Sequence, residues 1–141
     1  MESDDNQSSM GDSSLARKKI TNVERSAVTR KKVLAATIRC INDFGYEGTT
    51  VNKVAQLAAI SRGAAQHQFP SKIDLIIATA ELIVENQSKT RESMWDSLFA
   101  GNESFNAMID FSWSLQSHPD NIALLEIMMA TRNNEELRIR F

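Results

Sequence analysis

Apolar side chains recur at helical spacing through most of this chain, and polar residues mark where successive helices begin. Thr50 precedes a helix whose apolar residues fall at i, i+3, i+4 and i+7, namely Val51, Val54, Ala55 and Ala58. Ser61 precedes a second, short helix over residues 62–68, and only a tight turn fits between the two helices. This pattern predicts a helix-turn-helix over about residues 50–69, the arrangement that places a second helix in the major groove of DNA.

A further helix is predicted on each side of this motif. Residues 30–44 place apolar side chains along one side, and Gly45 follows where a left-handed residue would end the helix. Downstream, Ser71 with Asp74 forms an acidic variant of the capping box, which opens a long helix over about residues 73–99.

The rest of the chain also has helical spacing, so the predicted fold class is all-α. A fifth helix is expected at about residues 104–117, a sixth from Pro119 to about Thr131, and another from Glu135 onward. We therefore expect a three-helix unit joined by a long helix to a second, partial helical domain.

The order and spacing of these residues resemble the DNA-binding domain of the TetR family of transcriptional regulators. The resemblance covers about residues 26–85. It rests on Phe44-Gly45-Tyr46, Thr49-Thr50-Val51, Val54-Ala55, Ala58, Ser61-Arg62-Gly63-Ala64 and Phe69-Pro70-Ser71-Lys72-Ile73-Asp74-Leu75. It implies a repressor that binds a palindromic operator in double-stranded DNA as a homodimer, with a second domain for ligand binding and dimerisation. In that family the second domain continues through further helices, so this chain is expected to be truncated or to pair in another way.

Charge divides the chain into unlike segments, although the formal net charge is only −2. Residues 1–14 carry four acidic residues and no basic one, whereas residues 15–41 carry eight Lys or Arg against a single acid. Residues 76–141 carry ten acids against five bases. Basic charge therefore lies next to the proposed reading helix, where attraction to DNA phosphates would require it.

Three domains are expected from these patterns. Residues 1–25 form a disordered N-terminal arm, first acidic and then basic, residues 26–75 the DNA-binding domain, and residues 76–141 a partial helical regulatory domain. The basic part of the arm is either a solvated, mobile tail or a tether to DNA phosphates and the minor groove.

The residues predicted to contact DNA are Thr50, Arg62, Gly63, Gln66, His67 and Lys72. Arg62 begins the recognition helix, where its guanidinium can bind O6 and N7 of a guanine or clamp a phosphate. Gly63 either lets the backbone approach the groove or permits tight packing within the protein. Thr50 caps its helix and can also bind a phosphate. Lys72 has a phosphate partner if the domain docks in this way.

Several positions depart from the family pattern. Gln66, which can bind adenine, stands where a tyrosine is common, and a histidine often stands at Gln68. His67 can donate to a phosphate or to a base acceptor. Ala59 replaces the usual turn glycine, and a positive φ there would cost about 1 kcal/mol.

Three further side chains near the motif are assigned to the interior or its edge. Phe44 and Phe69 are predicted to be core residues, and Tyr46 either packs or meets a phosphate. Cys40 is the only cysteine, which excludes an intrachain disulfide and a cysteine-based zinc site, and it is expected to be buried.

Flexible and aromatic side chains in the second domain have two interpretations. These side chains are Met108, Phe111, Trp113, Met128 and Met129. They either line a pocket for a small apolar effector or form an ordinary hydrophobic core.

The sequence predicts no enzyme and no cofactor. His67 and His118 are the only histidines, and neither has Cys or carboxylate neighbours at metal-ligand spacing, so no catalytic or metal-binding residue is assigned. His118, before Pro119, is expected to cap a helix. Without a signal peptide or an apolar stretch of membrane-spanning length, the expected location is the cytoplasm, with no membrane partner.

These features together predict a sequence-specific transcriptional regulator. The alternative is a helical protein-interaction or adaptor module that keeps the helix-turn-helix shape without binding DNA. Salt separates the two, because DNA binding weakens steeply with ionic strength and an apolar helix interface does not.

Overall fold

The computed structural model describes residues 21–141, and within that range it contains helices and turns but no strand. The predicted all-α fold class is confirmed. The acidic segment and the first part of the basic arm, residues 1–20, lie outside the described residues. The described helices are α1 (Asn22–Gly48), α2 (Val51–Leu57), α3 (Arg62–Gln68), α4 (Lys72–Phe99), α5 (Phe105–Gln116), α6 (Pro119–Ala130) and α7 (Glu135–Arg140).

The first helix begins earlier than its apolar spacing predicted. Thr21 caps α1, because the Glu24 amide donates to the Thr21 hydroxyl at 3.2 Å and the Thr21 amide donates to the Glu24 carboxylate at 2.7 Å. The expected start at Arg30 is therefore wrong, since this exposed capping box extends the helix into the basic segment. Gly45 has the expected positive φ, at 70°, but it kinks α1 instead of ending it, and the helix continues to Gly48.

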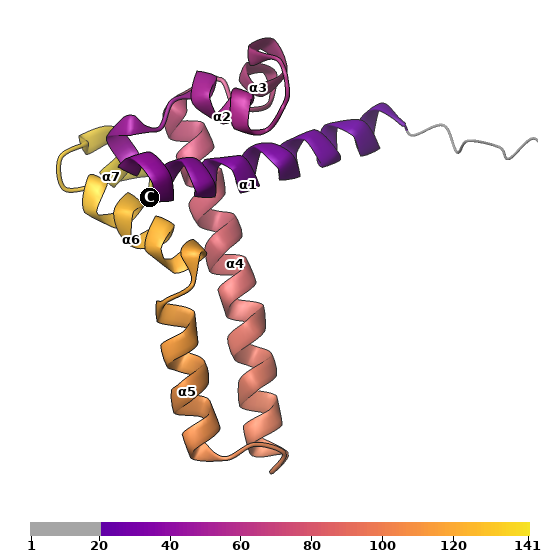
Figure 1. The fold of residues 1–141 in the computed structure, drawn as a ribbon, viewed down its shortest axis with the longest axis vertical. Helices are drawn as coiled ribbons and strands as arrows, with labels where there is room; N and C mark the ends of the chain where they lie inside the picture. The colour runs from indigo at the N-terminus through magenta and orange to yellow at the C-terminus, as the bar shows by residue number, and fades with distance from the viewer. Residues whose placement is uncertain (1–20) are drawn as a thin grey trace, which may run out of the picture.

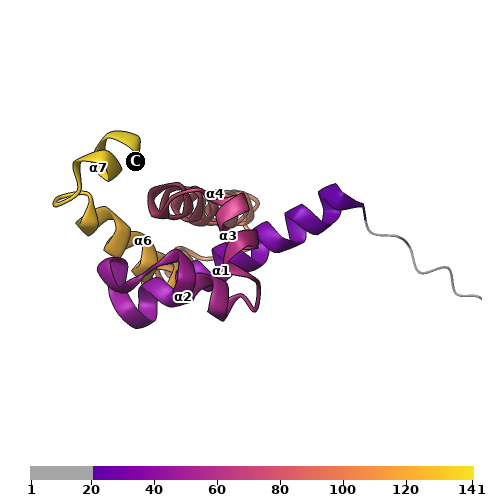
Figure 2. The same cartoon turned by 90° about the horizontal axis from the view of Figure 1, so that it is seen from above.

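Residues 22–82, which we call the head, enclose a first core. In Figure 2, α1 crosses α4, with α2 and α3 packed beside the crossing. Buried side chains from α1, α4 and the α2 region meet here, and the connection between α3 and α4 adds Phe69. They are Val33, Leu34, Ala36, Cys40, Val54, Ala58, Phe69, Leu75 and Ala78.

A second core ties the head to α6 and α7, which we call the C-terminal pair. Figure 1 shows α6 lying against the end of α1, with α7 next to the start of α4. The buried apolar residues are Ile41, Tyr46, Ile76, Ala80, Ile83, Ala123, Leu124, Ile127 and Leu137. The C-terminal pair therefore packs on the head itself rather than on the far end of α4.

The distal arm, residues 89–116, consists of the far half of α4 and the antiparallel α5 (Figure 1). No residue of α5 is buried, although the helix is capped by Ser104 at its start. Trp95 and Phe99 stack on the outside of α4, with ring centroids 5.8 Å apart. The arm is thus a two-helix hairpin with exposed aromatic side chains.

Two of the three predicted core assignments are confirmed. Phe69 and Cys40 are buried. Phe44 is 51% exposed, so its core assignment is wrong. It lies just before the Gly45 kink, and its ring packs under the Lys53 ammonium, 4.6 Å from the centroid, instead of entering the core.

Candidate nucleic-acid interface

The helix-turn-helix is formed by two capped helices and one strained turn. The Thr50 hydroxyl accepts from the Lys53 amide at 3.3 Å, and the Ser61 hydroxyl accepts from the Ala64 amide at 3.1 Å. Between the helices Ala59 has a φ of 53°, a left-handed conformation that is unfavourable for a residue with a Cβ. The Ile60 amide closes the turn by donating to the Ala55 carbonyl at 3.1 Å.

Helix α3 buries one side and leaves the other in solvent. Ala65 is its only buried residue, and Phe69 directly after the helix is also buried. The predicted contacts Arg62, Gly63, Gln66 and His67 are all exposed. The four residues therefore lie together on the solvent-exposed side of α3. The opposite side packs on the apolar core, which holds the helix in place.

Gly63 has room around it. A Cβ built at this position meets no atom within 4 Å. Packing within the chain therefore does not require a glycine here, and the approach of the α3 backbone to a DNA groove stays a prediction.

The N-terminal half of α1 lies beside α3 and carries basic residues. The Gln68 side chain donates to the Ser26 hydroxyl at 2.8 Å, and the Arg30 guanidinium lies 4.7 Å from the centroid of the Phe69 ring. Arg25, Lys31 and Lys32 of the same helix are exposed. The basic part of α1 therefore meets the C-terminal end of α3 and carries exposed positive charge near this contact.

Lys53 is a candidate phosphate ligand that the sequence analysis did not single out. It is exposed in the first turn of α2, three residues after Thr50, and its ammonium donates to the Gly48 carbonyl at 2.9 Å. Its position next to a helix N-terminus was the available signal, because phosphates bind at such termini.

Lys72 lies, like Lys53, at the C-terminal end of α1 and is partly enclosed. Its ammonium donates to the Tyr46 carbonyl at 2.7 Å and lies 4.1 Å from the centroid of the Tyr46 ring. Burial lowers the pKa of Lys72, while the nearby Glu47 carboxylate opposes that change. Burial also raises the pKa of the Tyr46 phenol, with a further contribution from Glu47. Tyr46 is buried, so of its two expected roles the structure shows packing.

The five residues of the expected effector pocket do not line one cavity among the described residues. Met128 and Met129 border a groove with Tyr46, whereas Phe111 borders a second groove beside Met94. Trp113 lines a third depression on the outside of α5, and Met108 lines none of these grooves. Helical spacing could not show this, because it does not fix how α5 and α6 are placed relative to each other.

Within residues 21–141 no group of three or more His, Cys, Asp or Glu side chains could hold a metal ion. No helix in that range is long and apolar enough to cross a membrane. His118 is the N-cap of α6, as predicted, and its Nδ1 accepts from the Asp120 amide at 3.3 Å.

Comparison with known proteins assigns the head to a family. Residues 33–79 match the model of bacterial regulatory proteins of the tetR family. The HTH-type transcriptional regulator CymR of Pseudomonas putida is 28% identical over 121 residues, which cover 86% of this chain and 60% of CymR. The HTH-type transcriptional repressor AcnR of Corynebacterium diphtheriae is 27% identical over 126 residues, with the same coverage of 86% and 60%.

A third relative shows the same partial coverage. The HTH-type transcriptional regulator BetI of Rhizobium meliloti is 28% identical over 113 residues, which cover 79% of this chain and 56% of BetI. The chain thus spans about 60% of the length of the relatives it matches first. No solved structure matches it. Residues 33–79, which contain the helix-turn-helix, are therefore a domain of the TetR family of bacterial regulatory proteins.

Proposed function

We propose that the protein is a transcriptional repressor that binds a palindromic operator in double-stranded DNA. The observation that carries this proposal is the open side of α3, where Arg62, Gly63, Gln66 and His67 lie together in solvent. They are held by the core of the head and bordered by exposed cations of α1. Relatives named as transcriptional repressors support the direction of regulation.

The proposed contacts divide into those that read bases and those that bind phosphates. Arg62 donates two hydrogen bonds to a guanine, and Gln66 is placed to bind an adenine. His67 donates to a base or to a phosphate. Thr50 and Lys72 bind phosphates, and such contacts fix the position of the protein on the duplex.

A palindromic operator requires two copies of the reading helix. Half-sites of such operators repeat at about 34–36 Å or a multiple of it, so one copy of α3 reads one half-site. We therefore propose that the functional form is a homodimer. Because the proposed target is chromosomal DNA, we infer a cytoplasmic location.

The proposal extends to a small apolar effector that binds to the regulatory segment. The groove beside Met128 and Met129 supports this role best, because it borders Tyr46 of the head. Flexible methionine side chains suit apolar ligands of varied shape. Phe111 and Trp113 border separate grooves, so they would join such a site only after a rearrangement of α5.

Enrichment of random double-stranded DNA by the purified chain tests this function, with the mass of the complex recorded alongside. We expect a palindrome with half-sites spaced by a whole number of helical turns, bound by two copies. Binding that ignores sequence would contradict the proposed base contacts. The absence of binding even at low salt would favour the protein-interaction module instead.

A further inference from the structure

We propose that Glu126, Asn134 and Arg140 of the C-terminal pair are positioning residues that hold Lys72 in place for a DNA phosphate. This inference rests on the proposed function. In this proposal the C-terminal pair determines the position of one phosphate-binding residue of the head, Lys72.

The position of Lys72 depends first on Tyr46. The Lys72 ammonium donates to the Tyr46 carbonyl at 2.7 Å and sits against the Tyr46 ring. The Glu47 carbonyl is 3.5 Å from the same nitrogen, which is a long and weak contact. Because an ammonium group has three N–H donors, at least one remains for a phosphate oxygen. Any movement of Tyr46 would therefore move the charge of Lys72.

Tyr46 is in turn held from two sides by the C-terminal pair. The Tyr46 amide donates to Oε1 of Glu126 at 3.1 Å, and Nδ2 of Asn134 donates to the Tyr46 hydroxyl at 3.3 Å. The neighbouring Gly45 makes room for this approach, since a Cβ there would lie 3.0 Å from the same Glu126 oxygen. Gly45 therefore allows both the kink in α1 and the close contact between α1 and Glu126 of α6.

The other side of the Lys72 site is the first turn of α4, which Arg140 holds. Nη2 of Arg140 donates to Oδ1 of Asp74 at 2.7 Å. The second Asp74 oxygen, Oδ2, accepts from the Ser71 amide at 3.0 Å and from the Ser71 hydroxyl at 2.7 Å. Lys72 lies between Ser71 and Asp74, so Arg140 is attached to the turn that carries it.

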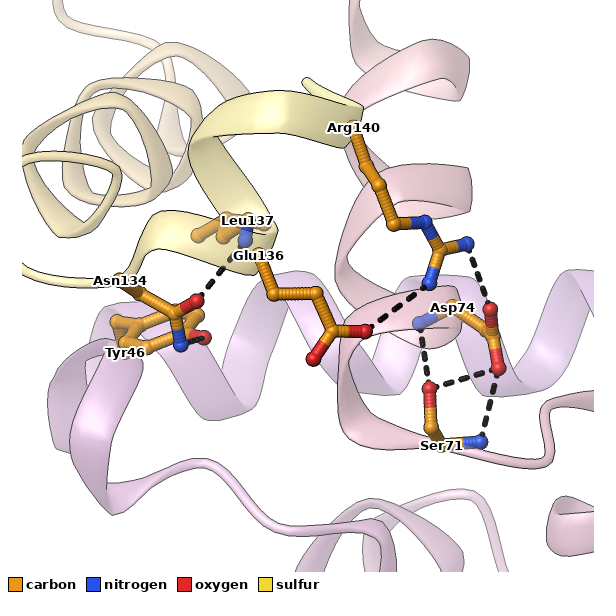
Figure 3. Close-up of polar contacts among 7 residues, drawn as sticks. All are labelled: Tyr46, Ser71, Asp74, Asn134, Glu136, Leu137 and Arg140. Carbon is orange, nitrogen blue, oxygen red and sulfur yellow. Dashed lines mark hydrogen bonds and ion pairs between the residues drawn. The ribbon is translucent and has the colours of Figure 1, made fainter.

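Figure 3 shows the two sets of contacts reached from one short helix, with Asn134 at Tyr46 and Arg140 at Asp74. Leu137 lies between them in sequence and is fully buried, which anchors α7. The contacts join residues 66 to 88 positions apart in the chain. A shift of the C-terminal pair would therefore change the position of Lys72 relative to the head.

The test compares two double variants with the same change of composition. Glu126→Ala/Arg140→Ala removes the acid and the base that hold the Lys72 site. Glu135→Ala/Arg138→Ala removes an exposed ion pair within α7, whose charged groups are 3.4 Å apart. Both variants keep the net charge, so any difference between them reflects the site rather than the overall field. Affinity for the enriched duplex is measured by fluorescence anisotropy over a series of salt concentrations.

We expect Glu126→Ala/Arg140→Ala to bind about tenfold more weakly, because it loses one hydrogen bond to a charged group and one partly exposed ion pair. Its salt slope should fall by about one unit, as for the loss of one phosphate contact. Glu135→Ala/Arg138→Ala should stay within about twofold of the original chain. The conservative Glu126→Gln/Arg140→Lys should recover most of the affinity and the slope.

A purely structural role would lower the melting temperature and leave the salt slope unchanged, which would overturn the inference. Equal losses of DNA affinity in the two Ala double variants would also overturn the inference, but they would leave the proposed function intact. If the original chain shows no preference for any duplex, both the function and the inference are contradicted. If Glu126→Ala/Arg140→Ala does not fold, Arg140→Ala against Arg138→Ala decides, with an expected two- to threefold loss only in the former.

Discussion

The head packs three helices and the start of α4 around a closed core, whereas in the distal arm α5 lies along α4 without burying a residue. The buried aromatic side chains of the described residues lie in the head, although Phe44 of the head is half exposed. Phe69 is buried in the head, while Phe99 and Trp113 of the arm are 82% and 74% exposed. A reading helix must present its side chains in one fixed geometry, and a filled core supplies that rigidity. The arm has no such core of its own, so the two regions should respond differently to the same kind of substitution.

The largest expected difference concerns the free energy of unfolding. Leu75→Ala empties a fully packed site in the head, where the side chain is 1% exposed, and should cost about 2–5 kcal/mol. Ile109→Ala in the arm, where the side chain is 51% exposed, should cost less than about 0.5 kcal/mol. Urea unfolding followed by circular dichroism measures both. Similar losses would show that the arm is buried in solution.

Base discrimination should depend on the head alone. Arg62→Ala should lose about 1–3 kcal/mol of discrimination at one base pair in each half-site, because it removes the proposed guanine contact. Phe105→Ala in the arm, where the side chain is 64% exposed, should leave discrimination unchanged. Affinities for single-base variants of the enriched duplex give the comparison. An unchanged profile for Arg62→Ala would argue against the proposed docking.

The strained turn of the head offers a substitution that should stabilise it. Ala59→Gly should raise the free energy of unfolding by about 1 kcal/mol, because glycine adopts the observed φ of 53° without steric cost. The neighbouring Ala58→Gly is the control. Ala58 has a φ of −77° and a methyl group buried in the first core, so it should lose about 1–2 kcal/mol on the same change. Destabilisation by both substitutions would contradict a left-handed Ala59 in solution.

Removing one lysine from each region should separate phosphate binding from general charge. Lys72→Ala should weaken binding to all duplexes by about tenfold and lower the salt slope by about one unit. Lys89→Ala in the arm removes the same charge from an exposed pair with Glu85 and should leave the slope unchanged. Titrations at several salt concentrations distinguish them. Equal slopes for the two variants would place Lys72 away from the phosphates.

The smallest expected effect is a pH dependence at the start of α4. Hydrogen bonds from Ser71, and then from Arg140, hold the pKa of Asp74 below its ordinary value of 3.8. A lowered carboxylate pKa stabilises the fold above that ordinary value, and the stabilisation is lost as pH falls through the lowered pKa. Asp74→Asn should therefore melt at a lower temperature than the original chain near neutral pH, with the gap closing below pH ~4. A gap that stays constant over the acidic range would contradict the ionised Asp74 contacts.

The sequence predicted the parts of the fold that depend on neighbours in the chain. Thr50, Ser61 and Ser71 each cap a helix in the structure, as their positions ahead of apolar runs indicated. The Ser71–Asp74 capping box was also predicted and is present. Such local signals suffice because the hydroxyl and the amides that it caps are at most three residues apart.

Contacts between segments that are distant in the chain could not be predicted from the sequence. Periodicity assigned Phe44 to the core, but its exposure depends on the kink at Gly45 and on Lys53 in the next helix. The bond between the Tyr46 amide and Glu126 joins residues 80 positions apart, and nothing in the local pattern marks it. In the candidate interface, the exposed residues of α3 could be predicted from the spacing of apolar residues. The contacts that position Lys72 could not, because they depend on where α6 and α7 pack.

An NMR titration of the isotope-labelled chain with its enriched duplex tests most directly the claim that the head binds DNA and the arm does not. At 15.8 kDa the protein is small enough for residue-by-residue amide signals. We predict that DNA shifts the amides of residues 50–53, 61–68 and 72, while those of residues 95–113 stay in place. Shifts confined to residues 95–113, with the head unaffected, would contradict the account.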